Sequence, residues 1–246
     1  MTVEAIIEQL KPSTLISKKE FEILVHSIEP QYSERSIYWI LSKLKHMGKL
    51  QSAGENGFFV LDDINTKPEY SYLHSDLMEE IIGKVEQEYP LVDFQVWELI
   101  QMNEFVNHQI ARNVLFIEVE NMLDESVFSM LSNAYNRVLL RPSSDIFYTY
   151  RDENVIVVQK LISEALKPVM GTHSCCLEKL LVDLFSKKLT GQLIQRAEYM
   201  SIYESAFARY RIGEKRLFRY ARRRNLEECI RGFINEKTQI QLLTEK

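Results

Sequence analysis

The feature that most constrains this sequence is a one-sided helix followed directly by a short hairpin, within residues 33–61. At about 100° per residue, the apolar side chains of the predicted helix 33–47 occupy one arc of roughly 120°. The arc must face a core, and it comprises Ile37, Ile40, Leu41, Leu44 and Met47.

Both ends of this helix and the hairpin have local signals. Ser33 can cap the first turn, and Gly48 can end the helix in the left-handed conformation. Two extended runs, 49–52 and 58–61, flank a turn in which Gly54, Asn56 and Gly57 tolerate positive φ. The segment therefore predicts a helix that leads into a β-ribbon.

Two shorter helices, 3–10 and 18–25, precede this unit, and Ser17 can cap the second. Three short helices closed by a ribbon follow the order of elements in a winged helix-turn-helix. We therefore expect residues 1–64 to form a winged-helix DNA-binding domain.

The face of the third helix opposite the apolar arc carries hydrogen-bond donors suited to phosphates and base edges. The candidate DNA-contacting residues are Arg35, Ser36, Trp39, Ser42, Lys43 and His46, with Tyr38 and Lys45 on one flank. Contact with a protein is the alternative, because residues 1–62 hold seven Lys and Arg against eight Asp and Glu. A homodimer could still bind DNA if a few cations per half-site converge on the groove.

The apolar rhythm breaks at about residues 62–70, which predicts a second domain at 70–246. A helix capped by Ser75 runs to 87, extended runs follow at 91–97, 114–119, 138–140, 146–150 and 155–158, and helices are expected at 98–107 and 125–134. From 175 onward the pattern is helical, with helices near 192–209, 214–224 and 226–236. The expected fold class is α+β: the winged helix, then a mixed α/β domain with a helical C-terminal part.

The predicted helix 214–224 is strongly basic on one side. Leu217, Phe218 and Ala221 form its apolar side. The other side carries Lys215, Arg216, Arg219, Arg222 and Arg223. Five like charges on one face repel one another, which indicates an acidic partner. The alternative is pairing within the chain, with Glu79, Glu80, Glu118, Glu120, Asp124 or Glu125.

No minimal signature of phosphate-cradling, dinucleotide-binding, zincin or serine-hydrolase chemistry occurs, so we expect neither catalytic residues nor a cofactor. Glu118 and Glu120 without a third ligand indicate a solvated or ion-paired face rather than a metal site. The cysteines have no metal-binding spacing, which indicates reduced structural thiols. The sequence starts without a leader and holds no run of roughly 20 apolar residues, so we expect a cytoplasmic protein that does not bind membranes.

Several short segments, taken in order, resemble the AbiEi-like antitoxins, bacterial proteins typically encoded beside a nucleotidyltransferase-like toxin. Besides the N-terminal helices and ribbon, the resemblance rests on residues 105–109, 116–120, 125–128, 161–165, 177–184 and 219–223.

The resemblance implies an antitoxin that also represses its own operon. Its N-terminal domain would bind the operon's promoter DNA through Arg35, Trp39, Ser42 and Lys43, and its C-terminal domain would counter the toxin by contact or indirectly, using the basic helix. Two alternatives stay open: a winged-helix regulator with a ligand-sensing α/β domain, and a protein-interaction module that does not bind DNA.

Overall fold

The computed structural model describes residues 2–12, 14–53, 57–61, 67–150, 152–162, 165–167, 173–187 and 189–243. The chain is a mixed α+β protein of two compact units, Met1–Leu73 and His74–Lys246. The division lies beyond the predicted boundary at 62–70, since the Leu73 amide donates to the Ala53 carbonyl and ties this segment to the first unit. Residues 62–66, the turn residues Gly54 and Asn56, and residues 163–164 of the resemblance lie outside the described ranges.

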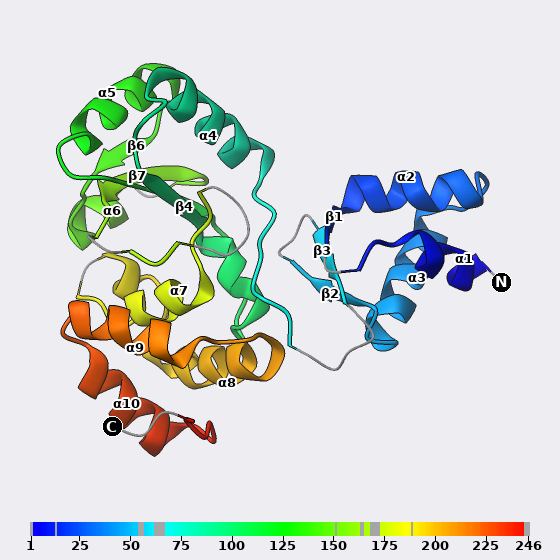
Figure 1. The fold of residues 1–246 in the computed structure, drawn as a ribbon. Helices are drawn as coiled ribbons and strands as arrows, with labels where there is room; N and C mark the ends of the chain where they lie inside the picture. Colours follow the sequence, from blue (N-terminus) through cyan, green and yellow to red (C-terminus); the bar gives the residue numbers. More distant parts are fainter. Residues whose placement is uncertain are drawn as a thin grey trace. The chain divides into compact units, whose positions relative to one another are not determined.

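The N-terminal unit packs three helices against a three-stranded antiparallel sheet (Figure 1). The helices are α1 (Thr2–Gln9), α2 (Lys18–Ile28) and α3 (Glu34–His46). The strands β1 (Leu15–Ser17), β3 (Gly57–Val60) and β2 (Leu50–Ser52) lie in that order across the sheet. The predicted helices and ribbon are therefore confirmed, and β1 is an additional strand that the sequence did not indicate.

Serine caps fix where three helices begin. The Ser17 hydroxyl accepts from the Glu20 amide while the Glu20 carboxylate accepts from the Ser17 amide, a complete capping box for α2. Ser33 caps α3, and Ser75 caps α4 (Asp76–Glu88). Gly48 follows α3 with φ of +67°. All three predicted caps are thus present, because each depends only on neighbouring residues.

The C-terminal unit is built on a four-stranded sheet of order β4-β5-β7-β6. The strands are β4 (Phe94–Glu98), β5 (Val114–Val119), β6 (Val138–Leu140) and β7 (Val155–Lys160). β4 is antiparallel to β5, whereas β7 runs parallel to both β5 and β6.

Helices cover both faces of this sheet (Figure 1). α4 and α5 (Asp124–Ala134) bury apolar side chains against one face, which includes Val96, Ile117 and Val158. α7 (Leu177–Asp183) lies on the other face, where the Lys179 ammonium of α7 meets Glu118 of β5. The helical C-terminal part continues with α8 (Tyr199–Arg209), α9 (Glu214–Arg223) and α10 (Glu227–Lys237).

Four local predictions are wrong. The helix predicted near 192–209 starts only at Tyr199, after short 3₁₀ turns. Residues 146–150 are not extended but belong to helix α6 (Ser144–Tyr150). Phe147 is the buried residue of this helix, so the aromatic side chains of this segment do not alternate between the two faces of a strand. The predicted helix 98–107 is a 3₁₀ turn, Leu99–Glu104. Met47 was expected in the core but is 48% exposed, since it follows the last turn of α3.

The cysteines are free thiols, with Cys175 and Cys176 buried and Cys229 exposed. Within the described ranges, no helix combines the length and apolarity that crossing a bilayer requires.

Candidate nucleic-acid interface

The N-terminal cap of α3 involves two hydroxyls. The Ser33 hydroxyl accepts from the Ser36 amide at 3.3 Å and lies 3.0 Å from the Ser36 hydroxyl. Ser36, one of the predicted DNA contacts, is therefore also part of the cap.

The outward face of α3 is exposed along its whole length. Arg35, Trp39, Ser42, Lys43 and His46 are all exposed, as the helical projection predicts. The indole of Trp39 is 60% exposed, and the Lys43 ammonium lies 5.0 Å from the ring centroid, a cation–π distance. Neither Arg35 nor Lys43 forms an ion pair with a described residue, so both charges stay available to an anion.

The flank of α3 is divided between solvent and the sheet. Tyr38 is 71% exposed. Lys45 instead turns to the ribbon, where its ammonium donates to the Ser52 hydroxyl at 2.8 Å and lies 4.8 Å from the Phe58 ring centroid. Lys45 therefore supports the packing of α3 on the sheet.

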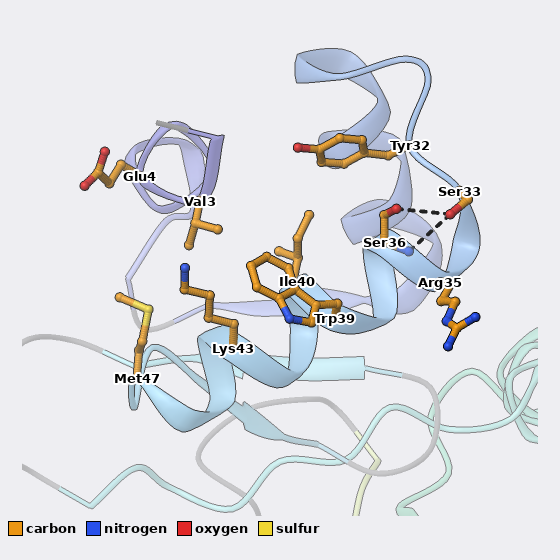
Figure 2. Close-up of a pocket in the computed structure, with 10 residues that line it drawn as sticks. All are labelled: Val3, Glu4, Tyr32, Ser33, Arg35, Ser36, Trp39, Ile40, Lys43 and Met47. Carbon is orange, nitrogen blue, oxygen red and sulfur yellow. Dashed lines mark hydrogen bonds between the residues drawn. The ribbon is translucent and has the colours of Figure 1, made fainter.

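A groove of about 760 Å³ runs between α1 and α3 (Figure 2). Four predicted DNA contacts line it, Arg35, Ser36, Trp39 and Lys43, whereas Ser42 and His46 lie outside the lining. The sequence did not indicate the other lining residues, Val3, Glu4, Tyr32, Ser33, Ile40 and Met47. The groove exists because α1 packs beside α3. The periodicity of each helix shows which of its faces is apolar but not which helix packs beside it, so the sequence could not predict the groove.

The predicted basic helix is α9, and its apolar side is buried as expected. Arg222 and Arg216 of this helix are paired within the chain. The Arg222 guanidinium donates to both carboxylate oxygens of Glu227, at 2.7 and 3.2 Å. Arg216 donates to the Lys167 carbonyl at 2.8 Å and lies 4.0 Å from the Glu178 carboxylate.

The other three α9 cations, Lys215, Arg219 and Arg223, are exposed. We call Lys215 and Arg219 the α9 basic face. Lys215 and Arg219 form no ion pair within the described ranges. Several of the carboxylates suggested as internal partners are paired elsewhere, namely Glu80 with Lys84, Glu118 with Lys179, and Asp124 and Glu125 with Arg141. Arg216 thus pairs with Glu178 and Arg222 with Glu227 within the chain. Neither carboxylate was among the expected partners.

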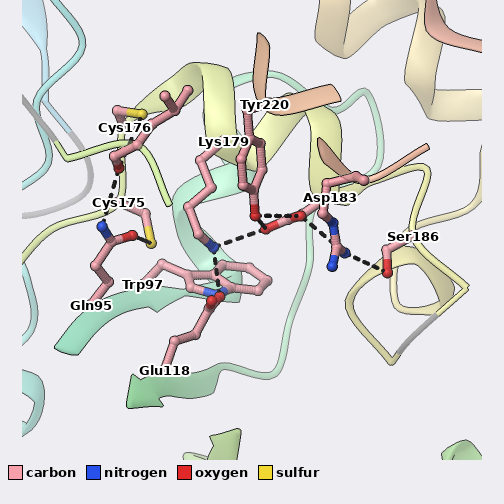
Figure 3. Close-up of polar contacts among 11 residues, drawn as sticks. Gln95, Trp97, Glu118, Cys175, Cys176, Lys179, Asp183, Ser186 and Tyr220 are labelled. Atoms are coloured by element: carbon pink, nitrogen blue, oxygen red, sulfur yellow. Dashed lines mark hydrogen bonds and ion pairs between the residues drawn. The ribbon is translucent and has the colours of Figure 1, made fainter. Parts of the chain in front are cut away.

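A buried charge network joins α9 to the sheet through α7 (Figure 3). The fully buried Lys179 ammonium lies 2.7 Å from the Glu118 carboxylate and 2.8 Å from Asp183. The Tyr220 hydroxyl of α9 donates to Asp183 at 3.2 Å, and Trp97 donates to Glu118 at 3.2 Å. Burial lowers the pKa of Lys179, but Asp183 and Glu118 raise it more, so it lies well above its usual value. The network therefore holds α9 by charged side chains whose pairing no sequence pattern indicated.

A second buried cluster links β4 to the start of α4. The Ser174 hydroxyl lies 2.8 Å from His74 Nε2, and His74 Nδ1 lies 3.3 Å from Glu98. The Glu98 carboxylate also accepts from the Ser75 amide, the Ser75 hydroxyl and the Asn113 amide group. With its oxygens so occupied, Glu98 anchors the α4 cap to the sheet. In the described part of the chain, no group of three or more His, Cys, Asp and Glu side chains could hold a metal ion.

Comparison with known families adds one result. A family model described as a family of unknown function, DUF6577, matches residues 36–240. The chain belongs to the DUF6577 family. No curated protein and no solved structure matches it. The match to the DUF6577 model begins within α3 and continues past α10, so it includes nearly all of the outward face of α3 and the whole α9 basic face.

Proposed function

We propose that this DUF6577 protein is a cytoplasmic, DNA-binding autorepressor that also acts as the antitoxin to a nucleotidyltransferase-like toxin. The observation that carries the DNA-binding part is the outward face of α3, where Arg35 and Lys43 flank the exposed Trp39 and are not paired within the described residues. Cations and an accessible ring suit contact with phosphates and base edges.

The arrangement of the N-terminal unit supports this proposal. The order α1-β1-α2-α3-β2-β3 is the order of elements in a winged helix, in which α3 would be the second helix of the helix-turn-helix. In that motif the second helix enters the major groove, about 12 Å wide, and its outward side chains contact the bases. The small net charge of this unit matters less than the local placement of Arg35 and Lys43, since contacts are made by a few convergent cations.

The direct test measures binding of the full chain to DNA from upstream of its own coding region, by fluorescence anisotropy over a range of salt concentrations. The double substitution Arg35→Ala with Lys43→Ala should weaken binding by about 1–3 kcal/mol for each side chain that reads a base. It should also make the salt dependence shallower, by about 0.9 for each phosphate that is no longer neutralised. Both side chains lie off the buried arc of α3, so the thermal melt should change little.

The matched control is Arg112→Ala with Lys237→Ala, which removes the same charges from exposed positions of the C-terminal unit. The control should bind DNA like the wild type. Equal binding by the α3 variant and the wild type would refute the assignment. Complete absence of salt-dependent binding would instead favour protein contact, which the exposed rings of Tyr38 and Trp39 would also suit.

The antitoxin part of the proposal is supported by the α9 basic face, because exposed like charges on one helix favour an acidic partner surface. The structure offers a matched pair of substitutions. Arg219→Gln removes a cation that has no ion pair among the described residues, whereas Arg222→Gln removes one whose charge Glu227 already neutralises.

Neutralisation is tested in cells that express the toxin encoded beside this protein. Arg219→Gln combined with Lys215→Gln should abolish protection, while Arg222→Gln should keep it, and both should still repress the promoter. Full protection by the soluble double variant would show that the α9 basic face does not meet the toxin or its substrate.

A further inference from the structure

We propose that the C-terminal unit binds a small phosphate-bearing ligand in a basic cavity at the carboxyl ends of β6 and β7. This inference goes beyond the DNA-binding and antitoxin proposal and does not depend on it. The cavity has a volume of about 450 Å³, within the usual range for small-molecule sites. Its lining holds three cations, Arg141, Lys160 and Lys187, and no carboxylate.

The position of the cavity follows from the sheet. β6 and β7 are parallel neighbours, and Arg141 and Lys160 stand at the carboxyl ends of these two strands. Ligands of open α/β sheets bind outside the carboxyl ends of parallel strands, where loops converge. The opposite wall is formed by Lys187, Leu189 and Gln192, which also line the cavity.

Hydrogen bonds hold that opposite wall in place. The Ser144 hydroxyl donates to the Gln192 side-chain oxygen, and the Gln192 amide group donates to the Lys187 carbonyl at 2.8 Å. This chain of contacts joins the turn after β6 to the segment that carries Lys187. The cavity is therefore bordered by fixed groups on both sides.

Arg141 is held in an unusual backbone conformation at the rim. Its φ is +44°, a left-handed value that costs energy for a residue with a long side chain. The Arg141 amide donates to the Val158 carbonyl at 2.8 Å, and its guanidinium meets the carboxylates of Asp124 and Glu125. These contacts hold the Arg141 side chain in place and neutralise its charge. Arg141 therefore shapes the cavity wall and contributes little to the attraction of an anion.

The attraction comes from the two lysines. The Lys160 ammonium donates to the neutral Asn121 side chain at 3.0 Å, which leaves its charge uncompensated. Lys187 is exposed and pairs with no carboxylate of the described residues. Two uncompensated ammonium groups, with the hydroxyl of Ser143 nearby, suit the oxygens of a phosphate group.

The test is isothermal titration of the full-length chain with AMP, pyrophosphate, inorganic phosphate and, as the probe that lacks phosphate, adenosine. AMP or pyrophosphate should bind at one site per chain, and adenosine should not. Binding of inorganic phosphate alone would identify a free-anion site of the same chemistry. Lys187→Gln and Lys160→Gln should each weaken binding at least tenfold, and the amide group that Lys160→Gln introduces can still donate to Asn121.

Lys237→Gln is the control, since Lys237 is an exposed lysine of α10 that forms no ion pair within the described ranges. This variant should bind the probes like the wild type. Because Lys187 is at the surface, its substitution should leave the thermal melt unchanged and keep the test valid even if Lys160→Gln folds poorly. Failure of all three phosphate-bearing probes to bind at millimolar concentration, or binding that Lys187→Gln does not weaken, would overturn the proposal.

Discussion

Replacing Lys179 with methionine should destabilise the C-terminal unit far more than any surface lysine substitution. Methionine keeps the length and most of the volume of the side chain but removes the ammonium that lies 2.7 Å from Glu118 and 2.8 Å from Asp183. Both carboxylates are buried, with side-chain exposures of 4% and 8%. Trp97 and Tyr220 would still donate to them, but a neutral donor does not replace the missing positive charge.

The magnitude follows from removing one member of a buried ion pair. Such removals cost about 3–5 kcal/mol, because the remaining charge keeps its desolvation penalty without its partner. For a unit of this size, each kcal/mol lowers the melting temperature by about 2–4 °C, so the expected drop is about 6–20 °C. The Arg224 guanidinium lies 3.2 Å from the Asp183 carboxylate and neutralises part of its charge. The loss of stability should therefore lie toward the lower end of the range of about 3–5 kcal/mol.

The assay is urea denaturation of the full chain, followed by thermal melting. The control is Lys84→Met, which breaks a surface pair with Glu80 at 3.6 Å between side chains 40% and 57% exposed. That substitution should cost at most about 0.5 kcal/mol. Adding Glu118→Gln to Lys179→Met should recover part of the stability, because the stranded charge is then removed as well. A cost below about 1 kcal/mol for Lys179→Met would refute the reasoning.

Two further predictions concern the anchor of α4 and two glycines. Burial raises the pKa of Glu98, but hydrogen bonds from His74 and Ser75 lower it more, so the pKa lies below its ordinary value of 4.5. The ionised Glu98 carboxylate therefore stabilises the fold at pH values above 4.5, and this stabilisation is lost as the pH falls further. Glu98→Gln should therefore cost about 1.5–3 kcal/mol in urea denaturation at neutral pH and clearly less at about pH 3; an equal cost at both would contradict this. Gly57→Ala should destabilise by about 1–3 kcal/mol, since a Cβ there would lie 2.7 Å from a carbonyl oxygen of β1, whereas Gly83→Ala, with open space at the Cβ, should stabilise α4 by about 0.5–1 kcal/mol in the same assay.

What the sequence predicted well is what neighbouring residues determine. Ser17, Ser33 and Ser75 each start a helix through a hydrogen bond within three residues, and all three caps were predicted correctly. The buried arc of α3 also follows from periodicity, except at Met47, where the helix has already ended. The outward residues of α3 and α9 could be named for the same reason.

The features that the sequence missed are made by residues far apart in the chain. β1 is only three residues long and exists because it pairs with β3. The sequence indicated only a helical pattern for the region of α7. All seven residues of this helix are buried, including Lys179 and Asp183, because the sheet covers one side and α9 packs on another. The groove beside α3 and the cavity beside Lys187 likewise depend on tertiary packing, which periodicity does not encode.

The phosphate-bearing ligand proposed for the C-terminal cavity also separates two accounts of the transcriptional control that we propose for this DUF6577 protein. A ligand-sensing regulator requires that ligand and DNA change each other's affinity, and coupling between two sites is reciprocal. If AMP changes the dissociation constant for operator DNA by some factor, saturating DNA must change the dissociation constant for AMP by the same factor. Measuring both constants in both directions, with Lys187→Gln as the ligand-blind control, decides between the accounts. Equal factors that disappear in Lys187→Gln would establish ligand sensing through this cavity. Unchanged constants for a chain that binds both molecules would show that DNA binding is independent of the cavity, as expected if the two units act separately in the proposed antitoxin.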